Sequence, residues 1–195
     1  MKCLVIVAHP DDEMIWMGGY MIEWRKKGGD LEIICLCRAN DSDRRPRFLK
    51  VCEELGADCS ISDLDDEKLG DIEINEVINR IKEMKKREKY DYIFTHGENG
   101  EYGHKRHIDV HRAVDKMIKD GGLECKKVFF FAYEGKNEPG EFCNIDRNAN
   151  KFIKLPKSVY LKKIHLIKDI YGFNENSFEV KSSGNAEAFR VEEKC

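Results

Sequence analysis

Two segments rich in histidine and acidic residues are the part of this sequence that could do chemistry. The first, "AHPDDE", spans residues 8–13 and places His9, Asp11 and Asp12 directly after the apolar run "LVIVA". The second, "HGENGEYGHKRHIDVH", spans residues 96–111 and holds four of the six histidines. Imidazole and carboxylate groups are zinc ligands, and three protein ligands with one open position are typical of a catalytic zinc site. Together the segments indicate a catalytic metal site.

A purely structural explanation of the first segment competes with metal binding. Pro10 would fix a turn, Asp11 would cap a helix, and Asp12 and Glu13 would complement the helix dipole. This explanation accounts for two of the acidic residues but gives no reason for His9.

The spacing of the histidines in the second segment favours a site over a packed core. A single buried histidine is usually a hydrogen-bonded core residue, but four within residues 96–111 are hard to explain in that way. His104 and His107 lie three positions apart, and His107 and His111 four, so each pair shares one face of a helix. His111 could be a further ligand, although a position in the core or behind the ligands is favoured. His165, in a late amphipathic helix, is interpreted as structural.

Strands and helices alternate along most of the chain, which predicts an α/β fold. The expected strands cover residues 3–8, 31–37, 59–62, 91–95 and 126–134, and the expected helices cover 12–27, 45–57, 73–88 and 105–120. A loop at 135–150, a helix at 156–172 and a short last strand at 186–191 complete the expected elements. With 195 residues, we expect one domain over residues 1–195: a Rossmann-like, three-layer fold with a mostly parallel sheet.

The unusual polar residues follow the predicted strands. In an open parallel sheet, ligands bind in the crevice outside the carboxyl ends of the strands. His9 follows the first strand, Arg38 the second, and His96 the strand at 91–95. The first turn carries carboxylates where a dinucleotide-binding fold would carry glycines, and an acidic turn repels a pyrophosphate but suits a cation.

The composition indicates which classes of binding partner and which cellular compartment to expect. The net charge is −3 with 36% charged residues of both signs, which argues against nucleic-acid binding. We expect no membrane span, and the apolar start is too short for a secretory signal. The eight cysteines are scattered without a CxxC pair, which is typical of a cytoplasmic protein with reduced thiols. The sequence leaves a homo-oligomer open.

"AHPDDE" after the first strand, with "GEYGH" and a second histidine about ninety residues later, resembles the PIG-L/LmbE-like zinc-dependent N-acetylglucosamine deacetylases. The pair Gly18-Gly19, "THG" at 95–97 and "AEAF" at 186–189 extend the resemblance. It implies a zinc ion, one per chain, with another divalent metal as the alternative. The metal ligands it implies are His9, Asp12 and His107. Asp11 would be the general base, and His104, as an imidazolium, and Tyr102 would stabilise the oxyanion.

The substrate-binding residues are predicted from position. Arg38 follows a central strand, and its guanidinium can donate two parallel hydrogen bonds to hydroxyls, a carboxylate or a phosphate. His96 is expected to contact the substrate or to support the ligands. The arginines of "DSDRRPR" (Arg44, Arg45 and Arg47) are expected to be solvated and paired with Asp41 and Asp43.

The function that this reading favours is hydrolysis of the N-acetyl group of a small N-acetylglucosaminyl conjugate, releasing acetate and a free amine. One alternative is a zinc amidohydrolase acting on another N-acyl substrate, such as a glycopeptide. The other is a non-catalytic α/β binding module in which "HPDDE" only caps a helix.

Overall fold

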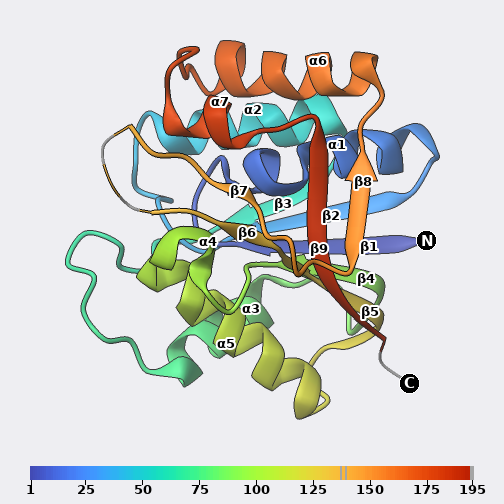
Figure 1. Cartoon of the computed structure of the whole chain (residues 1–195). Coiled ribbons are helices and arrows are strands. Elements are labelled where there is room, and N and C mark those ends of the chain that lie inside the picture. The colour runs from blue at the N-terminus through green and yellow to red at the C-terminus, as the bar shows by residue number, and fades with distance from the viewer. Residues whose placement is uncertain (137, 139, 194–195) are drawn as a thin grey trace.

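A mostly parallel seven-stranded sheet forms the centre of the computed structural model, which describes residues 1–136, 138 and 140–193 (Figure 1). The strand order is β3-β2-β1-β4-β5-β9-β8. The strands are β1 (Lys2–Val7), β2 (Asp30–Cys35), β3 (Asp58–Ile61), β4 (Lys89–Thr95), β5 (Glu124–Phe131), β8 (Lys151–Lys154) and β9 (Ala186–Glu193). The first five strands in this order are parallel. Strand β9 pairs antiparallel with β5, and the edge strand β8 pairs antiparallel with β9. The predicted α/β fold class is confirmed.

Helices cover both faces of the sheet and make three layers (Figure 1). On one face lie α1 (Asp12–Lys26), α2 (Arg44–Leu55) and α6 (Lys157–His165), and on the other lie α3 (Ile74–Met84) and α5 (Lys105–Lys119). Strand β1 is buried on both sides: Val5 and Val7 belong to the core under α1, and Leu4 and Ile6 to the core under α5. This two-sided burial explains why the first strand is a continuous apolar run.

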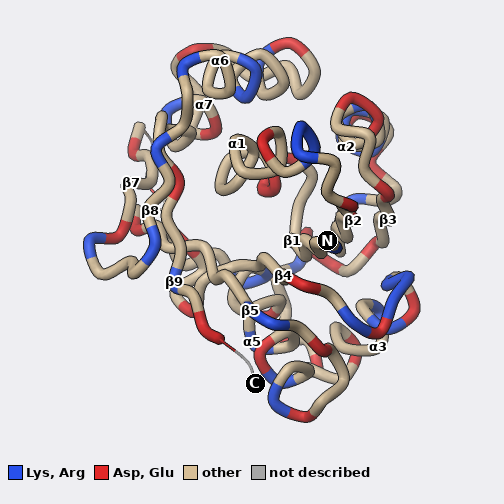
Figure 2. The backbone as a smooth tube through the Cα atoms, turned by 90° about the vertical axis from the view of Figure 1, so that its right-hand side faces the viewer, with Lys and Arg blue, Asp and Glu red and all other residues tan. Residues whose placement is uncertain are grey.

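Charges of both signs interleave along α2, α3 and α6 at the periphery, as the composition predicts (Figure 2). Helix α1 differs because it lies between the sheet and α6, and its Met14, Met17, Met21 and Trp24 are all buried. Among the helices of the described residues, we find none with the length and apolar character needed to cross a membrane.

The structure departs from the sequence prediction mainly after β5. The strand expected at 126–134 is interrupted at Ala132, and β6 (Tyr133–Glu134) pairs instead with β7 (Asn144–Ile145), inside the predicted loop. The helix expected at 156–172 is α-helical only to His165 and continues as the π-helical turn η1 (Leu166–Ile170).

Three further short elements were not predicted: α4 (Gly100–Gly103), the edge strand β8, and α7 (Phe178–Ser182). Elements of four or five residues are too short to display a period.

Candidate metal centre and active site

The residues of the two predicted segments meet at the carboxyl ends of the parallel strands, around a cavity of about 240 Å³. His9 and its neighbours follow β1, Arg38 follows β2, and His104 and His107 come from the start of α5. The cavity is lined by His9, Pro10, Asp11, Asp12, Ile15, Arg38, Asp41, Arg44, Asp66, Tyr102, His104, Phe178 and Glu179. Segments about ninety residues apart in sequence therefore build one site.

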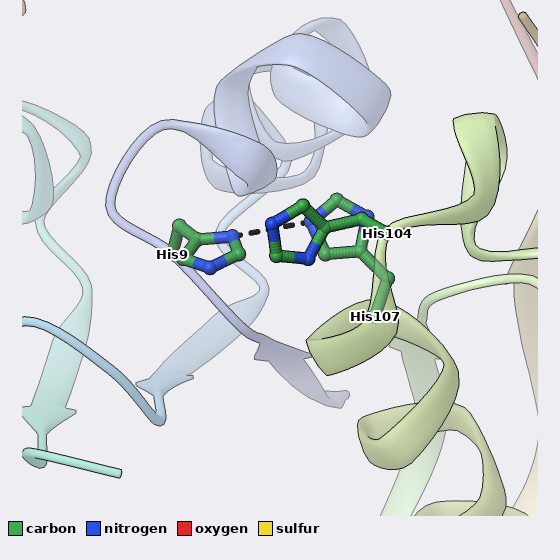
Figure 3. A group of neighbouring side chains, drawn as sticks. All are labelled: His9, His104 and His107. Carbon is green, nitrogen blue, oxygen red and sulfur yellow. Dashed lines mark hydrogen bonds between the residues drawn. The ribbon is translucent and has the colours of Figure 1, made fainter. Parts of the chain in front are cut away.

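Three donor atoms converge as a four-coordinate metal ion requires. His9 Nδ1 lies 3.1 Å from His107 Nε2 and 3.2 Å from Asp12 Oδ2, and His107 Nε2 lies 3.3 Å from the same oxygen. Figure 3 shows His9 facing His107, with His104 beside them. Tetrahedral zinc, with bonds of about 2.0–2.1 Å, separates its ligands by about 3.3–3.4 Å. The donor set therefore fits the ion that the family resemblance implies.

Each of the two histidines has a carboxylate behind it. His9 Nε2 donates to Asp66 Oδ1 at 2.9 Å, and His107 Nδ1 donates to Glu101 Oε2 at 2.5 Å. These bonds leave the opposite ring nitrogen of each histidine free to face the metal position. Although burial opposes it, Asp12 and Glu101 raise the pKa of His107 to about 10, so this position favours positive charge.

Asp12 is oriented by its own helix. Its Oδ1 accepts a hydrogen bond from the Trp16 indole at 3.0 Å, and its Oδ2 accepts one from the His9 backbone N–H at 2.8 Å. Oδ2 is therefore the oxygen that faces the histidines. Burial opposes ionisation, but the His107 and His96 imidazoles hold the pKa of Asp12 well below its ordinary value.

Asp66 and Glu101 were missed by the sequence analysis. Asp66 lies in the acidic segment "DLDDEKLGD" (63–71), whose acidity was the only available signal, and Glu101 lies inside the recognised "GEYGH". Neither spacing nor periodicity identifies a carboxylate that acts through a histidine.

Of the two roles expected for His96, substrate contact does not fit the structure, because its side chain is fully buried and lies outside the cavity lining. Its Nε2 accepts a hydrogen bond from the Ala8 N–H at 2.9 Å, so that lone pair is not available to a metal. Its Nδ1 donates to Glu101 at 2.8 Å, and its ring stacks on His107 at 3.9 Å. His96 supports the candidate ligands from behind, and His111 donates in turn to the His96 carbonyl at 3.0 Å.

Asp11 lies in the cavity wall with a backbone φ of 111°, and its side chain makes no capping hydrogen bond to α1. The capping explanation of this residue is therefore not supported. Burial, together with the charge of Asp12, raises the pKa of Asp11 to about 7 even though Arg44 opposes the shift. A carboxylate with a pKa near neutrality is suited to accept and return a proton.

The structure also contradicts the expectation for Arg44. It was predicted to be solvated, but its guanidinium forms an ion pair with Asp11 and lies 5.0 Å from the centre of the Phe173 ring. Arg47, by contrast, pairs with Asp43 at 2.8 Å, as predicted.

His104 and Tyr102 lie side by side, with ring centres 5.7 Å apart. Burial and the positive charges of His107 and His9 lower the pKa of His104 to about 3, which favours a neutral imidazole over the imidazolium implied by the resemblance. Among the described residues, His104 Nδ1 is a buried polar atom without a hydrogen-bond partner. Burial raises the pKa of Tyr102, so its phenol stays protonated and can donate.

Arg38 lies at the cavity, held by Asp66. Its Nε and Nη2 donate to Asp66 Oδ2 at 3.0 and 2.6 Å, and 37% of its side chain is exposed. Asp66 thus joins Arg38 to His9.

Backbone strain is concentrated at this site. Four non-glycine residues in the described part of the chain have positive φ, and three of them are Asp11, Arg38 and Glu101. Such conformations cost about 1–3 kcal/mol each and persist where surrounding contacts hold them, often at functional sites.

The fold and the site together define an α/β enzyme with a candidate metal centre at the carboxyl edge of its sheet. Residues 4–118 match the PIG-L family, described as GlcNAc-PI de-N-acetylase, and the chain belongs to this family. It is accordingly a hydrolytic N-deacetylase, of a family whose deacetylases depend on a metal ion.

One relative in sequence and two solved structures of similar fold can be compared with this chain. An uncharacterized protein of Acanthamoeba polyphaga mimivirus is 24% identical over 94% of this chain and 81% of its own length. The N,N'-diacetylchitobiose deacetylase of Pyrococcus horikoshii has a TM-score of 0.69 at 16% identity, covering 98% of this chain and 84% of that one. GalB, a 4-carboxy-2-hydroxymuconate hydratase of Pseudomonas putida, has a TM-score of 0.68 at 15% identity, covering 97% and 95%. Because a hydratase shares the fold, the fold alone does not name the reaction.

Proposed function

We propose that this protein removes the N-acetyl group from an N-acetylglucosaminyl conjugate, with one zinc ion held by His9, Asp12 and His107. The observation that supports the proposal best is the convergence of these three donor atoms, 3.1–3.3 Å apart, beside the Asp11 carboxylate. Residues 1–195 are proposed to act as one catalytic domain.

The chemistry divides among the residues of the cavity. A bound zinc ion would supply Lewis acidity toward the amide and lower the pKa of water. Asp11 takes the proton of the attacking water and delivers it to the departing amine as the C–N bond breaks. Acetate and a free amine leave.

When the water attacks the carbonyl carbon, negative charge develops on the carbonyl oxygen, and this oxyanion needs hydrogen-bond donors. Tyr102 and His104 supply them, and one such donor typically contributes about 3 kcal/mol. Arg38, steadied by Asp66, binds polar groups of the sugar conjugate with its guanidinium.

Metal analysis and an acetate-release assay test this proposal. We expect about one zinc per chain after metal-replete expression, as for three-ligand catalytic sites. Acetate release is measured on a panel of N-acetylglucosaminyl conjugates and, for the alternative, on an N-acylated glycopeptide. Activity on the glycopeptide alone would show that the substrate is an N-acylated glycopeptide and not a small N-acetylglucosaminyl conjugate. Zinc without acetate release from any substrate would overturn the deacetylase assignment, and absence of zinc would favour the non-catalytic module.

A further inference from the structure

Helix α1, which carries Asp12 in its first turn, is broken at Met17, where φ is −147° and ψ is 18°. In a continuous helix, the N–H groups of residues 19 and 20 would donate to the carbonyls of residues 15 and 16. Both of these bonds span the break. The four backbone groups lie in a largely buried helix, where unpaired polar groups are costly.

The two N–H groups after the break are bound by one carboxylate from the far end of the chain. Glu187, on β9, accepts from Gly19 at 2.7 Å through Oε1 and from Tyr20 at 2.8 Å through Oε2. Its side chain thus acts as the N-terminal cap of the second half of α1.

The two carbonyls before the break are bound by two other side chains. Lys163, on α6, donates from Nζ to the Ile15 carbonyl at 2.8 Å. Tyr133, on β6, donates its hydroxyl to the Trp16 carbonyl at 2.9 Å. Together with Glu187, these side chains give each of the four backbone groups a partner.

Lys163 and Glu187 also pair with each other at 2.8 Å, and both side chains are 0% exposed. A buried ion pair contributes little net stability compared with apolar residues of the same size, because both charges must be desolvated. Stability alone therefore does not explain why this pair stands in the core. The pair is explained if the core needs the particular backbone geometry that these two side chains hold at the break in α1.

The glycine pair at positions 18 and 19 of α1 allows other side chains to pack closely against the helix near the break. A Cβ on Gly19 would lie 2.4 Å from the Leu155 side chain, and one on Gly18 would lie 2.6 Å from the Met14 side chain and 3.3 Å from Lys163. The glycines let the broken part of α1 approach the segment that carries Lys163.

The break is connected to the metal site through Trp16. The indole of this residue holds Asp12 Oδ1, while its carbonyl is held by Tyr133 and its ring packs on the Tyr133 ring at 4.9 Å. The short first half of α1 is thereby fixed at both ends.

We propose that the Lys163–Glu187 pair, with Tyr133, is a positioning device that fixes the break in α1 and so aims Asp12 Oδ2 at the metal position. The inference rests on the proposed function in taking Asp12 as a ligand. It assigns a role to three side chains that come from beyond the first 130 residues of the chain.

The test compares two buried carboxylates. Glu187→Gln removes the charge that caps the second half of α1. Its matched control is Glu32→Gln: Glu32 is 1% exposed and accepts from the Lys86 N–H at 2.8 Å and the Tyr90 hydroxyl at 2.9 Å. Tyr90 belongs to the core on the face of the sheet opposite α1. Zinc affinity is measured by competition with a chromophoric chelator, and Tm by calorimetry.

We expect both variants to lower Tm, and only Glu187→Gln to weaken zinc binding, by about tenfold or more, as for changes to groups that orient a ligand. Tyr133→Phe, which removes one hydroxyl, should weaken zinc binding in the same direction and serves if Glu187→Gln does not fold. Lys163→Met combined with Glu187→Gln should recover part of the Tm but none of the zinc affinity.

The outcomes separate this inference from the proposed function. A parent protein that binds zinc but releases no acetate overturns the proposed function and leaves the positioning role intact. Zinc affinity within twofold of the parent in both Glu187→Gln and Tyr133→Phe overturns the positioning role, as does an equal loss in Glu32→Gln. A parent without zinc affinity overturns both.

Discussion

Replacing Glu101 with glutamine should weaken zinc binding without changing any zinc ligand. The Glu101 side chain is fully buried, and Oε2 accepts from His107 Nδ1 at 2.5 Å and His96 Nδ1 at 2.8 Å, while Oε1 accepts from the Gly97 N–H at 2.8 Å. Glutamine has one carbonyl oxygen, and its NH₂ group cannot accept a hydrogen bond. The glutamine side chain can therefore accept hydrogen bonds from the two histidines or from the Gly97 N–H, but not from both.

The size of the effect follows from the bonds that are lost. A hydrogen bond to a charged group contributes about 1.5–3 kcal/mol. Since about 1.4 kcal/mol corresponds to a factor of ten, loss of one such bond on the metal side lowers zinc affinity by about 10–100-fold. We expect the free energy of unfolding of the metal-free protein to fall by about 2 kcal/mol.

Chelator competition measures the zinc affinity, and urea unfolding of the metal-free protein measures the stability. Glu98→Gln is the control, because Glu98 is exposed and its side chain pairs with Arg190 at 3.1 Å. If Glu101→Gln keeps the zinc affinity of the parent, Glu101 does not set the orientation of His107, and the reasoning fails.

Three further variants test the assigned roles. His107→Ala should lose most zinc binding and, because metal binding is linked to folding, the rise in Tm that zinc gives the parent; full zinc occupancy would remove His107 from the ligands. Asp11→Asn should keep zinc but lose several orders of magnitude in kcat; metal loss there, with zinc retained in Asp12→Asn, would reverse the two carboxylates. Arg38→Ala should lower kcat/KM by one to two orders of magnitude, about 1.4–2.7 kcal/mol, at unchanged zinc content. Kinetics equal to the parent's would exclude Arg38 from substrate binding.

The sequence by itself predicted the α/β class and the edge of the sheet at which the site lies. Both depend on local information: apolar runs and helical periods identify the elements, and in a parallel sheet the residues after each strand gather at one edge. "AHPDDE" and "GEYGHKRH" could be recognised for the same reason, since each carries its chemistry within a few residues.

Only the tertiary structure decided the partners of the buried charged groups. The sequence could not show that Asp66 holds both His9 and Arg38, that Arg44 pairs with Asp11, or that His96 lies in the interior. A polar group removed from water takes the complementary group that folding brings beside it, whatever their separation along the chain.

The break in α1 illustrates the same limit. Its sequence has a helical period throughout, and the only local sign of a break is the glycine pair at 18–19. The carboxylate that caps the second half of the helix is 168 residues away from Gly19, and the lysine is 148 residues from Ile15. A helix breaks where distant side chains satisfy the backbone groups that the break releases, and that condition exists only once the whole sheet has formed.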